Sequence, residues 1–232
     1  MFEDETQGVK PVRVTYREQL QEVVDDLISM AESARHALRF ATRALLEVDL
    51  QLSEQVISDD VRLDEIHDDL ERRCFMLLAR QAPVAGELRT VVATLRMLTS
   101  LARMGDLSAH VAKIARLRYP EPAVPKPMQP NFARMAEVAE QMIVCATEAL
   151  RTSDVSAAQE LAAQDTEMDT LRRTQFRILL GEDWSHGVEA AVDVALLGRY
   201  YERIADHTVA ISRQVIYVVT GESPDGEDWP RF

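Results

Sequence analysis

Residues 12–82 contain neither glycine nor proline, and residues 131–180 are free of both as well. These two residue types break helices most strongly, so their absence favours long helices. From Leu20 onward, apolar or small side chains recur at alternating steps of four and three residues, whereas a strand would show a period of two. This seam consists of Leu20, Val24, Leu27, Ala31, Ala34, Leu38, Ala41, Leu45 and Val48. The pattern predicts a first helix over about residues 15–48 that packs nearly antiparallel to its neighbours.

The rest of the chain predicts further helices of similar length. They are expected near residues 52–80, from just after Pro83 to 117, and near 131–152, 155–181 and 186–220. Five prolines between Pro120 and Pro130 are too dense for the interior of an element and indicate an extended connector.

We therefore predict an all-α fold of two tandem three-helix bundles with six long helices. The first bundle is expected over residues 15–118 and the second over residues 131–221, joined by a proline-rich linker at 119–130 that would act as a hinge. Residues 1–14 are expected to form a flexible N-terminal extension, and residues 222–232 a flexible acidic tail.

Charge and hydropathy exclude several classes of function. The chain has 39 acidic and 26 basic residues and a formal charge of −13, the wrong sign for neutralising a nucleic-acid backbone. No stretch approaches the roughly 18 apolar residues that a membrane span requires, and the acidic N-terminus lacks the apolar core of a signal peptide. We expect no nucleic-acid partner and no transmembrane segment. The expected location is the cytoplasm, with peripheral contact at the inner face of the membrane left open.

Acidic motifs of one kind occur in both halves and predict an internal repeat. In the second helix of each half, Asp60-x-x-x-Asp64 lies 105 residues before Asp165-x-x-x-Asp169. In the third helix of each half, Ala102-Arg-Met-Gly-Asp106 lies 100 residues before Glu202-Arg-Ile-Ala-Asp206. The matching positions indicate that the halves are two copies of one unit.

Residues four apart on a helix lie on one face, so these motifs present two carboxylates side by side, and like charges repel. Glu202 also falls on the apolar seam of the last helix, where a carboxylate is costly unless paired or metal-bound. Two ways to neutralise the second-half acids stay open. One is an interhelical salt-bridge network formed by Arg172, Arg173, Arg199 and Arg203. The other is a metal ion, because two facing helices would supply hard oxygen donors.

Three stretches resemble the PhoU family of phosphate-transport regulators, and the resemblance extends over about residues 15–221. They are Leu78-Ala-Arg-Gln-Ala-Pro-Val-Ala-Gly-Glu-Leu-Arg89, Leu101-Ala-Arg-Met-Gly-Asp106 and Tyr201-Glu-Arg-Ile-Ala-Asp-His207. The resemblance implies a pair of three-helix bundles, in agreement with the pattern of breakers and seams. It also implies that the doubled acidic motif binds clusters of iron or other metals.

Carried over residue by residue, the resemblance predicts a complete, stronger metal site in the second half. Its ligands would be Asp165, Asp169, Glu202 and Asp206. The first-half site would be weaker, because Ala102 stands where an acid is expected. Its ligands would be Asp60, Asp64, Asp106 and His110, with His67 as a further candidate. The alternative is that both histidines are partly exposed surface residues without a ligand role. The expected ions are iron, zinc, manganese or magnesium, with imidazole shifting the preference away from magnesium.

The resemblance implies a regulator without enzymatic activity that negatively regulates phosphate uptake and phosphate-starvation signalling. It would link the phosphate ABC transporter to the phosphate sensor histidine kinase, and it would form a homodimer. Two alternatives stay open: a di- or multi-metal carboxylate enzyme with ferritin-like chemistry, and a salt-bridged structural helical bundle without metal.

Overall fold

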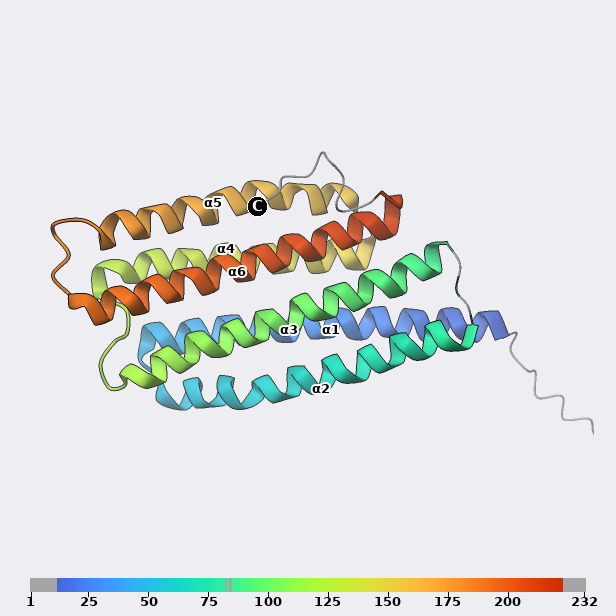
Figure 1. Cartoon of the computed structure of the whole chain (residues 1–232), viewed down its shortest axis with the longest axis horizontal. Helices are drawn as coiled ribbons and strands as arrows, with labels where there is room; N and C mark the ends of the chain where they lie inside the picture. Colours follow the sequence, from blue (N-terminus) through green and yellow to red (C-terminus); the bar gives the residue numbers. More distant parts are fainter. Residues whose placement is uncertain (1–11, 82, 84, 223–232) are drawn as a thin grey trace, which may run out of the picture.

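The structure is a computed structural model that describes residues 12–81, 83 and 85–222. Within these residues it contains six long α-helices and one short 3-10 turn (Figure 1). The helices are α1 (Val12–Glu47), α2 (Leu50–Gln81), α3 (Gly86–Arg118), α4 (Gln129–Thr152), α5 (Val155–Leu179) and α6 (Gly187–Thr220), and the turn is η1 (Lys126–Met128). The prediction of an all-α fold with six long helices is confirmed.

Most helices begin or end within a few residues of the predicted bounds. Helix α1 begins at Val12, so residues 12–14 of the expected N-terminal extension are helical. Residues 1–11 of that extension, and residues 223–232 of the expected acidic tail, lie outside the described part of the chain. The linker region is not wholly extended, because it contains η1 and α4 begins already at Gln129.

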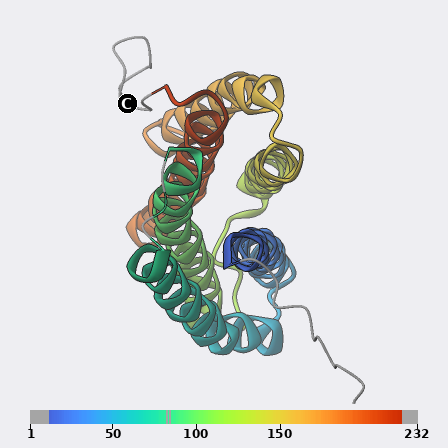
Figure 2. The same cartoon turned by 90° about the vertical axis from the view of Figure 1, so that its right-hand side faces the viewer.

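The six helices form two three-helix bundles that pack side by side. Helices α1, α2 and α3 contact one another, as do α4, α5 and α6, while α3 packs on α6 and α1 on α4. Viewed end-on, α2, α3, α6 and α5 follow one another in an arc, and α1 and α4 lie within its hollow (Figure 2). The centre of the arc is therefore the seam between α3 and α6.

Buried side chains from both bundles form one continuous hydrophobic core. Tyr201 in α6 is completely buried, shares a hydrogen bond of 2.7 Å with Thr42 in α1, and packs its ring against Phe132 in α4. At the α1–α4 contact, Arg35 donates to Glu140 at 2.6 Å. We expected a hinge at the proline-rich linker, but the linker instead joins two halves that share a core.

The seam predicted for α1 largely faces this core. Leu27, Ala34 and Leu38 are at most 1% exposed, as expected. Val23 and Met30 are equally buried, so the apolar stripe is wider than the strict four-and-three pattern, as is usual when a helix packs against more than one neighbour. In the described ranges, no helix combines the length and hydropathy needed to cross a membrane.

Candidate metal centre: two acidic clusters

The acidic residues predicted as ligands lie on the four helices of the arc. Asp60 and Asp64 are on α2 and Asp106 is on α3, whereas the second set is on α5 and α6. We call Asp60, Asp64 and Asp106 the first cluster, and Asp165, Asp169, Glu202 and Asp206 the second cluster. The first cluster thus belongs to the α2–α3 pair and the second to the α5–α6 pair, and the two pairs meet where α3 packs on α6.

In the first cluster, Asp60 is the carboxylate that the others approach. Its pKa is raised by partial burial, then by the charges of Asp106 across the helix pair and of Asp64 on its own helix. His110 and Lys113 on α3 partly offset this. Asp106 also accepts a hydrogen bond of 2.9 Å from Arg103. The charges of Asp64 and Asp106 therefore both act on Asp60, with cations close by.

The two histidines considered for the first site do not join these carboxylates as placed. His110 is exposed, and its ring stacks on Tyr200 of α6 with 5.5 Å between centroids. The Nδ1 atom of His67 contacts its sequence neighbour Asp68 at 3.2 Å. His110 thus lies near enough to Asp60 to affect its pKa, but its ring packs against a residue of the second half.

The second cluster brings carboxylates from α5 and α6 to face one another. Partial burial raises the pKa of Asp165, and the charges of Asp169 and Asp206 raise it further, with Glu202 contributing less. The pKa of Asp206 is likewise raised, first by partial burial and then by Glu202. These shifts have the physical cause anticipated from the motif spacing: like charges gathered where water solvates them poorly.

Glu202 differs from the other acids in this cluster because two arginines already neutralise it. Its Oε2 atom lies 3.0 Å from Nη1 of Arg172 and 2.6 Å from Nη1 of Arg199. Burial lowers the pKa of Arg172, while the hydrogen bond to Glu202 raises that of Arg199. Nearby, Arg173 lies 3.6 Å from Asp169. The salt-bridge network considered from the sequence is thus present around Glu202 and, more loosely, at Asp169.

The carboxylate oxygens of the two clusters are suitable ligands for a hard cation, although these side chains do not surround a common point. Among the described residues, no three His, Cys, Asp or Glu side chains are close enough as they stand to hold a metal ion. In the second cluster, however, partial burial and neighbouring carboxylates raise the pKa values of Asp165 and Asp206, and a bound cation would oppose both effects. Carboxylate oxygens favour magnesium, manganese or iron. The cluster fits such an ion in chemistry and charge, and binding would require Glu202 or its neighbours to reorient.

Several polar residues beside the second cluster did not stand out in the sequence. Gln175 is completely buried between α5 and α6, and its Nε2 atom donates to the carbonyl oxygen of Val194 at 2.5 Å. Gly198 makes room for it, since a Cβ at that position would lie 1.9 Å from Oε1 of Gln175. A glycine in the apolar seam of α6 was the available signal. His207 lies near Arg103 and Arg203, whose charges, together with burial, lower its pKa.

Comparison with known proteins identifies the family. The family model described as the PhoU domain matches residues 27–115 and residues 132–215, one match for each bundle. The PhoU homolog 2 of Mycobacterium tuberculosis, named a phosphate-specific transport system accessory protein, is 45% identical over 92% of this chain and 100% of its own length. The PhoU homolog 1 of Mycobacterium leprae, of the same name, is 42% identical over 94% and 99%.

A solved structure agrees with these matches. The crystal structure of PhoU from Pseudomonas aeruginosa superimposes with a TM-score of 0.84 and 25% sequence identity, covering 89% of this chain and 100% of that one. The chain belongs to the PhoU family, and the resemblance inferred from its motifs is confirmed.

Proposed function

We propose that this chain is a non-enzymatic, metal-binding regulator that restrains phosphate uptake and phosphate-starvation signalling. The proposal is supported by membership of the PhoU family and by relatives named as accessory proteins of the phosphate-specific transport system. It includes contact with the phosphate ABC transporter and its sensor histidine kinase, and a location at the cytoplasmic face of the membrane. These partners and this location are carried by the family resemblance alone.

The second acidic cluster is the observation that carries the metal-binding part of the proposal. Asp165, Asp169 and Asp206 would hold the ion, with Glu202 joining them at the cost of an arginine contact. A bound cation would supply positive charge that offsets the repulsion among these carboxylates. The chain's own contribution is to hold the acids on two packed helices, α5 and α6, so that the separation of the carboxylates is set by the fold.

The experiment that tests this proposal combines metal analysis with a cellular assay. Protein purified without chelator is expected to contain iron, zinc, manganese or magnesium, measured by elemental mass spectrometry. In cells lacking the gene, phosphate uptake should rise and the wild-type chain should restore restraint. Asp165→Asn/Asp169→Asn should restore it only in part. Metal-free protein together with full restoration by this variant would contradict the role of metal.

One observation favours a second candidate, in which the acidic clusters are only structural. The pairing of Glu202 with Arg172 and Arg199 neutralises one acid without any metal. In that case chelator would leave the melting temperature of wild type and of Asp206→Asn alike. Under the main proposal, chelator lowers the melting temperature of wild type more than that of the variant, because a bound ligand stabilises the folded state by mass action.

The proposal also includes a homodimer. Large apolar side chains remain exposed on α2, among them Phe75 and Met76, which are 54% and 41% exposed. A second copy could cover such side chains. Light scattering at micromolar concentration should give twice the monomer mass, and a monomer mass would contradict this part.

A further inference from the structure

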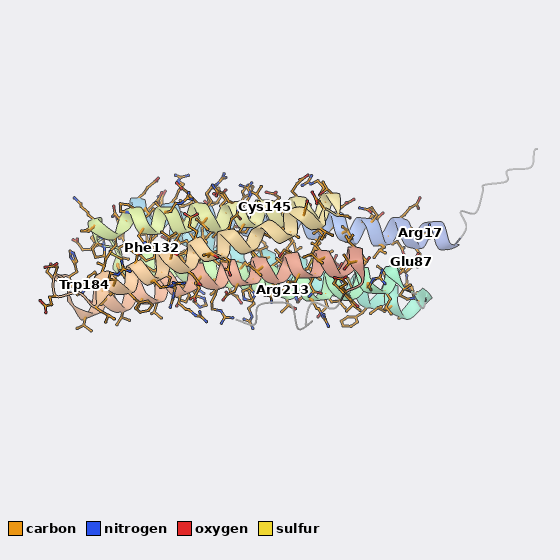
Figure 3. All side chains as sticks on the ribbon, turned by 90° about the horizontal axis from the view of Figure 1, so that it is seen from above. Arg17, Glu87, Phe132, Cys145, Trp184 and Arg213 are labelled. Atoms are coloured by element: carbon orange, nitrogen blue, oxygen red, sulfur yellow. The ribbon has the colours of Figure 1, made fainter. Side chains whose placement is uncertain are left out.

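A groove of about 660 Å³ lies at the end of the molecule where α5 connects to α6. Its walls are almost entirely apolar and include Phe176, Leu180, Trp184, Val188, Val192 and Ala195. Trp184 marks this end of the molecule in Figure 3. Its indole nitrogen donates to the carbonyl oxygen of Gly187 at 2.9 Å, which holds the ring against the start of α6.

The side chains around this groove are unusually exposed for their type. Leu180 is 83% exposed, Val188 81% and Val192 51%. Single exposed apolar residues are common, but contiguous ones mark a contact surface. At the repeat offsets, the first half has Glu71 in place of Phe176, but it keeps exposed apolar residues in place of Leu180 and Val188, namely Phe75 and Leu88. The first half therefore shares part of this apolar surface, on α2 and at the start of α3.

Arg172 lies between the groove and the second acidic cluster. The guanidinium of Arg172 lies over the ring of Phe176, 5.1 Å from its centroid, and the same guanidinium pairs with Glu202. Asp165 lies farther along α5, roughly 16 Å from Phe176 at the helical rise per residue. Along the α5–α6 pair, the surface thus changes from apolar at the connection, through the arginines paired with Glu202, to the carboxylates of Asp165 and Asp169 about three turns away.

An apolar surface followed by an acidic one is suited to an amphipathic helix. A helix laid between two helices presents apolar side chains at steps of three and four residues, and basic side chains at its other end would meet the carboxylates. A second copy of this chain is a poorer match, since each copy carries a formal charge of −13. An anionic membrane is a poorer match as well, because Glu182 and Asp183 directly precede Trp184 in the connection.

We propose that the α5–α6 groove binds an amphipathic helix of a partner protein, with apolar residues over Phe176, Leu180 and Val188 and basic residues over Asp165 and Asp169. Binding does not depend on metal, since the carboxylates themselves attract the basic end. A metal ion in the second cluster would compete with that end. The proposed surface is thus separable from the metal-binding function.

A designed peptide tests the proposal in the presence of chelator. The probe is a helix-forming peptide of about 18 residues, roughly 27 Å long as a helix, with leucines on one face of its first half and lysines on the same face of its second half. Trp229→Phe leaves Trp184 as the sole tryptophan, because the chain has two. The peptide is expected to change Trp184 fluorescence with a saturable, micromolar Kd, and a peptide with glutamates in place of lysines should bind at least about tenfold more weakly.

Variants of the protein separate the two ends of the groove. Leu180→Asp/Val188→Asp should weaken peptide binding by at least about tenfold, and the high exposure of both residues leaves the fold intact. Asp165→Asn/Asp169→Asn should weaken it several-fold at low salt and little at high salt. The matched control is Val61→Asp on α2, also an exposed apolar residue, at 60%. It should bind as wild type does.

The same measurements can overturn the proposal. Absence of peptide binding to wild type, or equal binding by Leu180→Asp/Val188→Asp, would contradict it. A Trp184 fluorescence shift produced by anionic lipid vesicles and not by the peptide would assign the groove to a membrane. A mass that falls from dimer to monomer in Leu180→Asp/Val188→Asp, without peptide binding to wild type, would assign it to a second copy.

Discussion

In the second half of the molecule, Glu202 lies between two arginines, Arg172 and Arg199. The repeat offsets of 105 and 100 residues place uncharged or weakly basic residues at all three corresponding positions of the first half. These are Ala102, His67 and Thr99. The acid and both of its counterions are thus absent together. The comparison teaches that a partly buried acid and its counterions form one unit, because either part alone would leave an unpaired charge at the helix interface.

The two helix pairs also approach each other differently. In the second half, buried Gln175 fits against Gly198, whereas the first half has the buried leucines Leu70 and Leu98 at the corresponding positions. The first half has its close approach at Gly105, where a Cβ would lie 3.2 Å from Oδ1 of Asp60. Each helix pair therefore has one glycine that a side chain of the partner helix approaches closely: Gly105 beside Leu63 and Asp60, and Gly198 beside Gln175.

The largest expected effect is a difference in metal content between variants of the two clusters. If this difference were absent, the two clusters would be equivalent. Asp165→Asn/Asp169→Asn should lose most of the metal bound to the purified protein, whereas Asp60→Asn/Asp64→Asn should lose little. The reason is that the second cluster has an additional carboxylate, Glu202, where the first half has Ala102. Elemental mass spectrometry of both variants measures this. Equal losses, or a larger loss from the first-half variant, would show that Ala102 does not weaken the first site.

Gly198→Ala should destabilise the protein by about 1–3 kcal/mol, the usual cost of overpacking a close-packed interior. The new methyl group would collide with Gln175, which is completely buried and hydrogen-bonded to Val194. Gly198→Ala/Gln175→Ser should recover part of the loss. Gly86→Ala is the control, because its nearest neighbour would be 3.8 Å away. Urea unfolding measures all three variants, and wild-type stability of Gly198→Ala would refute the polar close approach.

Removing the acid at Glu202 and adding one at Ala102 test whether a partly buried acid needs its counterions. Glu202→Ala should cost about 1–2 kcal/mol, because Arg172, only 16% exposed, loses its partner. Ala102→Glu should not stabilise the first half and should cost roughly 0.5 kcal/mol without metal, since it adds a like charge four residues before Asp106. The same variant should bind more metal than wild type. A stabilising effect of Ala102→Glu in chelator would show that the first half can neutralise the added acid without an ion.

The smallest effect is a pH dependence of stability in chelator. The folded-state pKa of Asp165 is raised above its ordinary value of 3.8, so the folded protein binds this proton more tightly than the unfolded chain. The stabilisation this proton provides is present at low pH and is lost as the pH rises through the raised pKa. Asp165→Asn should therefore gain stability relative to wild type between pH 4 and pH 7, by roughly 0.2–0.5 kcal/mol for each like-charge pair removed.

Urea unfolding of wild type and variant across this pH range gives the difference that matters, because titratable groups remote from Asp165 contribute equally to both. Asp60→Asn is the matched first-half variant, since the pKa of Asp60 is raised by the same causes. A smaller gain for Asp60→Asn is expected, because Lys113 and His110 partly offset the repulsion there. A pH-independent difference for both variants would contradict the raised pKa values.

Much of the fold follows from local features of the sequence. The long segments without glycine or proline predicted the helices to within a few residues, and the doubled motifs predicted that acids of α2 face α3 and acids of α5 face α6. Helix formation and side-chain period depend on neighbouring residues, which the sequence displays directly.

Only the tertiary structure decided how these parts meet. The expected hinge became a shared core through contacts such as Thr42 with Tyr201, which lie in different bundles. The ring of His110, a candidate ligand of the first site, stacks on Tyr200 of the second half. The sequence left four arginines as possible partners of Glu202, and the packing of α5 against α6 selects Arg172 and Arg199. Each of these outcomes depends on packing between residues far apart in the chain, and local periodicity carries no information about which distant faces meet.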